Sequence, residues 1–361
     1  MRKIPIIEAR GLARTFKSRK RTVEAVRGVD LTVGEGEIVG FLGPNGAGKT
    51  TTLRMLTTLL KPTAGMATVA GADLLSNPLE VRKKIGYVPQ AIGETMGGTD
   101  PSCLVIEELL DQAALYRIGG AQARERAELL TGQLELTGLE QRLVKTLSGG
   151  QRRRLEIALG LVHQPPLVFL DEPTTGLDPQ SRANLWTHIR RLRDDLNTTV
   201  FLTTHYLDEA DSLCDRILII DSGRIVAEGT PEELKHRISG DLVTIDVDGD
   251  RDPAAALAAV KDLEGVRDAA LSARTLRVTV DAGGQQLMGI MRALDAASVP
   301  IASIQLARPT LDDVFLTLTG RSLRDDSPNP GGPGAGGDGD GKQAGPVEQA
   351  EQADEATRSR T

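Results

Sequence analysis

The chain has 361 residues, a length that predicts two or three domains. Its charged fraction of 26% is ordinary, and a net charge of −7 without an extended basic region argues against nucleic acid as a partner. The two cysteines, Cys103 and Cys214, have neither metal nor redox spacing, so we expect reduced thiols in the cytoplasm. No apolar run approaches the ~20 residues needed to cross a bilayer, so any membrane-spanning part is expected on a separate polypeptide.

A phosphate-binding loop is predicted between a strand and a helix in the first part of the chain. Ile38 to Leu42 is a short apolar run typical of a buried parallel strand, and GPNGAGKT follows it directly. In this pattern glycines let the backbone amides turn onto phosphate oxygens, the lysine neutralises the β and γ phosphates, and the threonine ligates magnesium. A plain tight turn is the weaker interpretation. The residues predicted to contact nucleotide here are Gly43, Pro44, Asn45, Gly46, Ala47, Gly48, Lys49, Thr50 and Thr51.

Between Gln90 and Leu147 the apolar residues follow a helical period, which predicts a helical subdomain at about 91–146. The stretch from Ala91 to Ser102 is rich in glycine and is either a docking loop or a slack connection. Two apolar stripes define the helices: Leu109, Leu110, Ala113, Ala114 and Leu115, then Ala127, Leu129, Leu130, Leu134 and Leu136.

A second helix start suited to an anion follows this subdomain. Ser148, Gly149 and Gly150 stand immediately before a predicted helix that begins near Gln151. Taken alone, LSGGQ is equally consistent with an ordinary capped helix. In a chain that already carries a phosphate loop, it predicts a second phosphate contact.

Two acidic residues follow the next apolar strand. Leu167 to Leu170 predict a buried strand, so Asp171 and Glu172 emerge at its carboxyl end, where open α/β sheets bind ligands. We expect Asp171 to hold magnesium and Glu172 to act as the general base for an attacking water. A solvated strand end or a helix cap is the alternative, which the upstream phosphate loop disfavours.

The C-terminal third predicts a smaller α+β unit. Alternating apolar residues at 243–247 and 276–280 indicate strands, with short strands near 269–271 and 304–306 and helices at 254–263 and 285–297. The order β-α-β-β-α-β suggests a ferredoxin-like unit. From Asp325 the composition is too polar and glycine-rich to bury a core, so we expect a disordered tail whose removal after Leu323 leaves activity intact.

Taken in order, GPNGAGKT, Gln90, LSGGQ, LVFLDEP and TTH resemble the motif set of the ABC-type ATPases over Ile6 to Leu234. The ending ARPTLDDVFLTLTG resembles the C-terminal extension of the daunorubicin-resistance type of ABC ATP-binding subunit. With the element pattern, this implies an α/β fold: a P-loop ABC ATPase cassette at 1–234, a small α+β domain at 240–320, and an acidic tail rich in glycine and proline at 325–361.

The resemblance also implies roles for individual residues. Ser148 and Gly150, with Gly149 and Gln151, would contact the nucleotide held by a second cassette, and Asp178 would cross that interface. Gln90 would sense magnesium and the attacking water, and His205 would contact the γ-phosphate and orient Glu172. Phe16 stands where the family places an aromatic residue against adenine; a core phenylalanine is the alternative.

The implied function is the ATP- and Mg²⁺-dependent ATPase subunit of an exporter for a drug-like or hydrophobic molecule. Its expected partners are a separate integral membrane permease and a second cassette, in a homodimer, on the cytoplasmic side of the cell membrane. The alternatives are another ABC system, such as an importer or a lipid or polysaccharide exporter, or a non-transport ABC ATPase.

Overall fold

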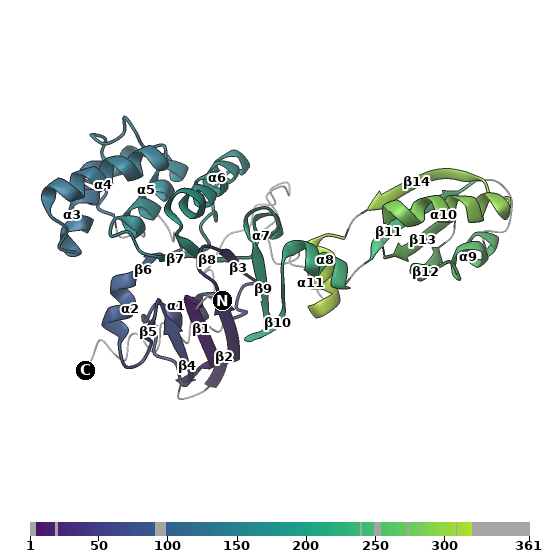
Figure 1. Cartoon of the computed structure of the whole chain (residues 1–361), viewed down its shortest axis with the longest axis horizontal. Coiled ribbons are helices and arrows are strands. Elements are labelled where there is room, and N and C mark those ends of the chain that lie inside the picture. Colours follow the sequence, from purple (N-terminus) through teal and green to yellow (C-terminus); the bar gives the residue numbers. More distant parts are fainter. Residues whose placement is uncertain are drawn as a thin grey trace, which may run out of the picture. The chain divides into compact units, whose positions relative to one another are not determined.

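The computed structural model describes residues 5–18, 21–90, 99–238, 240–248, 254–272, 274–281, 283–307 and 309–319. These residues form two compact units that divide between Glu228 and Gly229 (Figure 1). The predicted tail at 325–361 and residues 91–98 of the glycine-rich stretch lie outside the described residues. Within the described ranges, no helix combines the length and the apolar composition that a membrane span requires.

A six-stranded sheet forms the centre of the first unit. The strands β3, β6, β7, β8 and β9 pair in parallel, and β3, β7 and β8 are buried at every residue. Burial on both faces explains why these strands are continuous apolar runs rather than alternating ones. The order across the sheet is β10 (Arg224–Gly229), β9 (Arg216–Asp221), β3 (Ile38–Leu42), β8 (Thr199–Thr204), β7 (Leu167–Asp171) and β6 (Ile85–Val88).

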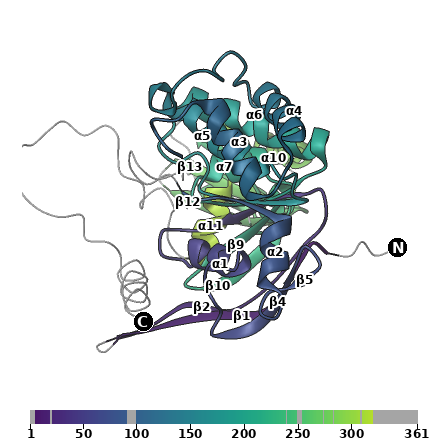
Figure 2. The ribbon, with the colours of Figure 1, turned by 90° about the vertical axis from the view of Figure 1, so that its left-hand side faces the viewer.

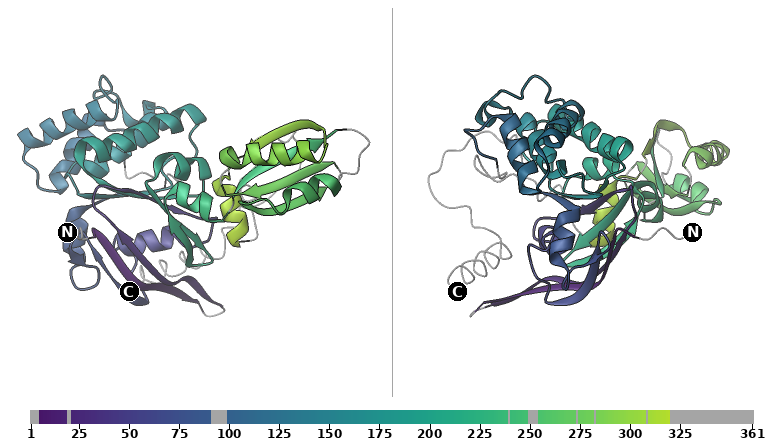
Figure 3. Two further views of the ribbon diagram at one scale, coloured as in Figure 1. Left: turned by 45° about the vertical axis from the view of Figure 1, so that its right-hand side comes forward. Right: turned by 60° about the vertical axis from the view of Figure 1, so that its left-hand side comes forward.

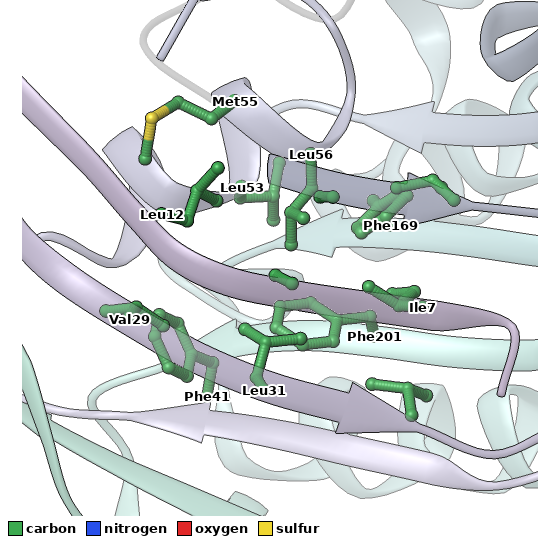
Figure 4. Close-up of a cluster of buried hydrophobic side chains, with 14 of the residues drawn as sticks. Ile7, Leu12, Val29, Leu31, Phe41, Leu53, Met55, Leu56, Phe169 and Phe201 are labelled. Carbon is green, nitrogen blue, oxygen red and sulfur yellow. The ribbon is translucent and has the colours of Figure 1, made fainter. Parts of the chain in front are cut away.

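An antiparallel sheet lies on one side of this central sheet. Its order is β2 (Arg21–Val33), β1 (Ile7–Ser18), β4 (Ala64–Val69) and β5 (Ala72–Asp73). The helix α1 (Lys49–Leu56) packs between the two sheets, where Leu53 and Leu56 join the core shown in Figure 4. Phe201 in the same core lies 5.7 Å from Phe41 and 5.6 Å from Phe169, measured between ring centroids. This core fixes the strand and the helix that flank the phosphate loop.

Helices cover the opposite side of the central sheet, where α3 to α6 lie in Figure 2. Leu109 and Ala113 of the first predicted stripe are buried, but Ala114 and Leu115 are exposed, as is Leu129 of the second stripe. The predicted stripes were therefore too wide, because only positions three or four apart share one helix face. Besides α1, the described helices of this unit are α2 (Pro78–Lys84), α3 (Val105–Leu115), α4 (Gly120–Gln133), α5 (Gly149–Leu161), α6 (Pro179–Leu196) and α7 (Leu207–Leu213), with a 3₁₀ turn at Val144–Thr146.

The second unit contains a four-stranded antiparallel sheet in the order β12-β13-β11-β14. Alternate residues of β11 and β13 are buried, and they pack against α9 and α10, which lie on one face of the sheet (Figure 3). The ferredoxin-like prediction is confirmed. The elements in chain order are β11 (Asp241–Val247), α9 (Ala254–Val260), β12 (Val266–Ser272), β13 (Thr275–Val280), α10 (Gly283–Ala296) and β14 (Ile301–Ala307).

Two further helices belong to the second unit. α8 (Pro231–Ile238) packs against α11 (Leu311–Thr319), and Leu234, Val314 and Phe315 are all buried. The end expected for the first domain, Leu234, therefore falls inside α8. The pairing of α8 with a helix at the far end of the chain explains why the units divide at Gly229 instead.

Candidate functional site

The loop from β3 to α1 has a backbone that only glycine accommodates at its two ends. A Cβ atom on Gly43 would lie 2.3 Å from the carbonyl oxygen of Ile220, and one on Gly48 would lie 2.5 Å from that of Ala25. Gly48 also has a φ of 105° at the N-terminal cap of α1, where no side chain supplies a capping hydrogen bond. The first-turn amides of α1 are thus directed into the loop without a capping side chain, as phosphate binding requires.

Lys49 spans this loop and is only 4% exposed. Its Nζ atom donates to the carbonyl oxygens of Gly43 (2.8 Å) and Pro44 (3.2 Å) and lies 3.3 Å from Glu172 Oε1. A buried ammonium group needs such partners to offset its lost hydration. The contact joins the phosphate loop to the acidic end of β7.

Asp171 is held by two hydroxyl groups at the end of β7. Its Oδ1 atom accepts hydrogen bonds from Thr203 (2.6 Å) and Thr50 (3.2 Å). Burial and the neighbouring Glu172 charge raise the pKa of Asp171, against the effect of the two hydroxyl donors. A cation would favour the ionised form, and carboxylate and hydroxyl oxygens are ligands that Mg²⁺ accepts. Thr50 and Asp171 therefore fit a magnesium site.

Glu172 lies at the centre of the site, with partners from several elements. Its Oε2 atom accepts hydrogen bonds from Gln90 Nε2 (3.0 Å) and Thr175 Oγ1 (3.1 Å). His205 Nδ1 lies 3.2 Å from the same oxygen, a distance that allows an ion pair when the imidazole is protonated, but without the alignment of a hydrogen bond. Burial opposes ionisation of Glu172, yet His205 and Lys49 outweigh it and lower its pKa to about 2. Glu172 is therefore a carboxylate at neutral pH.

The backbone of Glu172 is unusual as well. Its φ of 43° lies in the left-handed region, which costs free energy for any residue with a Cβ atom. The preceding peptide is held because the Glu172 amide donates to Thr203 Oγ1 at 3.0 Å. This conformation turns the Glu172 side chain toward Lys49, Gln90 and His205.

The LSGGQ residues form a separate cluster at the start of α5. Ser148 caps the helix by accepting from the Gln151 amide (3.3 Å), and its own amide donates to Gln151 Oε1 (3.0 Å). Ser148 and Gly149 are exposed. Asp178 caps α6 in a similar way, by accepting from the amides of Gln180 and Ser181 at 3.0 Å each. In one chain these residues are thus open to contact by a second molecule.

Phe16 is 3% exposed in β1, and the guanidinium carbon of Arg14 lies 4.6 Å from the centre of its ring. Such burial agrees with the alternative of a core phenylalanine. With the ring buried and the Arg14 guanidinium over it, the adenine contact stays a prediction.

Three residues of the site were not assigned a role from sequence. Thr203 and Thr175 hold Asp171 and Glu172, and Arg153 contacts the backbone beside both carboxylates. Thr203 lies in the TTH motif, which could have pointed to it. Arg153 was interpreted only as part of a basic helix, because a run of three arginines does not reveal which one turns inward.

A phosphate loop, a buried lysine, a hydroxyl-bound aspartate and an ionised glutamate meet at the carboxyl edge of a parallel sheet. This combination defines a P-loop nucleoside triphosphatase.

Comparisons with known proteins identify the family within the P-loop nucleoside triphosphatases. Residues 26–175 match the ABC transporter family, and residues 229–319 match the C-terminal domain of the ATP-binding protein DrrA1-3-like group. The daunorubicin resistance ATP-binding protein DrrA3 of Streptomyces coeruleorubidus is 42% identical over 83% of this chain and 93% of its own length. The daunorubicin/doxorubicin resistance ATP-binding protein DrrA of Streptomyces peucetius is 42% identical over 89% of this chain and 94% of its own.

Solved structures of ATP-binding cassettes are also similar to this chain. The dimeric, post-hydrolysis form of the ATP-binding cassette MJ0796 with ADP and phosphate has a TM-score of 0.55 and 27% identity, covering 62% of this chain and 98% of that one. The chain belongs to the ABC transporter family, as an ATP-binding subunit of the daunorubicin-resistance type. It is an ATPase, and the predicted family and fold class are confirmed.

Proposed function

We propose that this chain powers the export of a hydrophobic, antibiotic-like molecule by hydrolysing Mg²⁺-bound ATP through Glu172. The observation that carries the proposal is the arrangement around Glu172, an ionised carboxylate with Lys49, Gln90 and His205 within 3.3 Å of its two oxygens. A buried carboxylate beside the phosphate loop can accept a proton from a water that attacks the γ-phosphate.

Each residue of the site has a distinct part in this mechanism. Lys49 and the backbone amides of 45–50 would hold the phosphates, while Thr50, Asp171 and Gln90 would hold the magnesium ion, which neutralises phosphate charge when bound. His205 and Gln90 would orient Glu172 and the water. Hydrolysis is then a matter of positioning and charge, because the protein forms no covalent intermediate.

We further propose that two copies of this chain form the working pair. Ser148 and Gly150 would close on the γ-phosphate bound to the partner copy, with Gly149 and Gln151 forming the capped helix start behind them. The exposed position of Ser148 supports this arrangement, as does the dimeric form of the similar cassette MJ0796.

The membrane partner is proposed to be a separate permease that holds this chain at the cytoplasmic face of the cell membrane. Its docking point would be a cavity of about 300 Å³ beside Gln90, lined by Tyr87, Pro89, Gln112, Tyr116 and Glu156 among others. A larger cavity of about 400 Å³ lies at the ends of α4 to α6, but none of its lining residues touches the site around Glu172. The proposed cargo class follows from the names of the relatives, which are daunorubicin and doxorubicin resistance proteins.

The test is transport by this chain together with its permease in inverted membrane vesicles, with doxorubicin fluorescence as the probe. We expect ATP-dependent uptake that Glu172→Gln abolishes, while ATP still binds and holds the cassettes in a closed dimer. Glu135→Gln is the matched control, since the Glu135 carboxyl is 56% exposed on the surface. Rapid multiple turnover by Glu172→Gln would refute the mechanism, and ATPase activity without transport of any hydrophobic drug tested would refute the exporter assignment.

A further inference from the structure

Arg153 is a buried cation that contacts the backbone beside Glu172 and beside Gln90, two residues of the site that are hydrogen-bonded to each other. It lies in the first turns of α5, and its side chain is 3% exposed. Its Nε atom donates to the carbonyl oxygen of Pro173 (2.9 Å), and its Nη2 atom donates to that of Asp171 (3.1 Å). Its Nη1 atom donates to the carbonyl oxygen of Pro89 (2.8 Å). The guanidinium therefore binds the backbone on both sides of Glu172 and directly before Gln90.

One of these hydrogen bonds, to the carbonyl oxygen of Asp171, holds the peptide that precedes Glu172, the residue with the unfavourable left-handed φ. The peptide that joins Asp171 to Glu172 is held at its carbonyl by Arg153 and at its amide by Thr203. With that peptide fixed at both ends, Glu172 keeps its left-handed φ of 43°. Hydrogen bonds from a charged donor are the stronger kind, and a planar guanidinium can reach several carbonyls at once. Arg153 thus orients the carboxylate without reaching it.

The charge of Arg153 is balanced by Glu156, one helical turn further along α5. Arg153 Nη1 donates to Glu156 Oε2 at 2.6 Å, and both side chains are almost completely buried. Glu156 and Pro89 also line the cavity of about 300 Å³ described above. The two residues that Nη1 contacts are therefore both at the surface of that cavity, whereas Nε and Nη2 contact the backbone around Glu172.

We propose that Arg153 is a positioning residue that links occupancy of this cavity to the alignment of Glu172 and Gln90. Any element that enters the cavity and displaces Glu156 or Pro89 also displaces the guanidinium, whose hydrogen-bond partners among the described residues are these two together with Asp171 and Pro173. The link to transport rests on the proposed function, in which the permease occupies the cavity. The alignment of Glu172 by Arg153 does not depend on that assignment.

The alignment is tested with Arg153→Lys in the full chain alone. Lysine keeps the charge but is a point donor that cannot reach carbonyls on opposite sides. We expect the Kd for ATP to stay within about twofold of wild type while kcat falls by about tenfold or more. Arg191→Lys, at an exposed arginine that pairs with Glu135, is the matched control. Unchanged kcat would overturn the proposal, and so would a parallel loss of ATP binding, which would indicate a structural role only.

The link to the cavity is tested with Glu156→Gln in the complex with the permease. If Arg153→Lys does not fold, this second variant still tests whether the cavity and the site are linked. The readout is the ratio of the ATPase rate with the permease to the rate without it. We expect this ratio to fall to about one, since the neutral amide can still accept a hydrogen bond but no longer balances the charge of the guanidinium. A ratio equal to that of wild type would overturn the link. Failure of the wild-type complex to transport would refute the proposed function and leave the Arg153→Lys result standing.

Discussion

Gln90 Nε2 donates a hydrogen bond of 3.0 Å to Glu172 Oε2, although 82 residues separate the two along the chain. The reason is the sheet, because β6 and β7 are adjacent parallel strands in which Val88 pairs with Leu170. Parallel strands end at the same edge, so the residues that follow them meet. All of α3, α4 and α5 lie between these two strands in the chain, so this hydrogen bond joins the two ends of the segment that carries these helices.

Lys49→Ala should weaken ATP binding by roughly ten- to a hundredfold, the usual effect of removing a charged hydrogen-bond donor. The site would lose the cation placed between the phosphate loop and Glu172. Equilibrium binding of a fluorescent ATP analogue measures the change. The control is Lys83→Ala, at an exposed lysine paired with Glu80 on α2, and normal binding by Lys49→Ala would contradict the role given to the loop.

Thr203→Val should lower kcat by about tenfold and leave the Kd for ATP nearly unchanged. Valine has the shape of threonine but leaves the Glu172 amide without its acceptor and Asp171 without its closest donor. Steady-state ATPase assays together with ATP titrations separate the two effects. Thr187→Val, at an exposed threonine on α6, is the matched control. A variant with wild-type kcat would show that this hydroxyl does not align the carboxylates.

Acid should destabilise the wild-type chain more than the Glu172→Gln variant. The folded-state pKa of Glu172 is about 2, below its ordinary value of 4.5, so its contribution is complete above pH 4.5 and is lost as the pH falls toward 2. Between pH 6.5 and pH 4 the wild type should lose about 1 kcal/mol more free energy of unfolding than the variant. Urea unfolding at the two pH values measures this difference, and equal losses would mean that Glu172 is not held ionised.

Leu109→Ala and Leu115→Ala should differ sharply in stability although both residues lie on α3. Leu109 is fully buried, so its truncation should cost about 2–5 kcal/mol, whereas Leu115 is 79% exposed and should cost about 0.5 kcal/mol or less. Thermal unfolding of the two variants provides the comparison. Similar losses at both positions would mean that α3 faces the core differently.

The sequence by itself determined those features of this protein that depend on residues close together in the chain. The phosphate loop, the capped start of α5 and the acidic end of β7 depend on neighbouring residues, because glycine conformation, helix capping and strand ends are local properties. The motif order then implied the family, and the alternating pattern after residue 240 implied the β-α-β-β-α-β unit that the structure contains.

Only the tertiary structure decided which side chains meet. Nothing local distinguishes Arg153 from Arg152 and Arg154, yet the packing of α5 directs Arg153 alone of these three to the backbone around Glu172. The exposure of Leu115, the inclusion of α8 in the second unit and the burial of Phe16 beneath Arg14 depend in the same way on distant partners. Burial and long-range hydrogen bonds belong to pairs of residues brought together by the sheet, and a linear pattern does not specify those pairs.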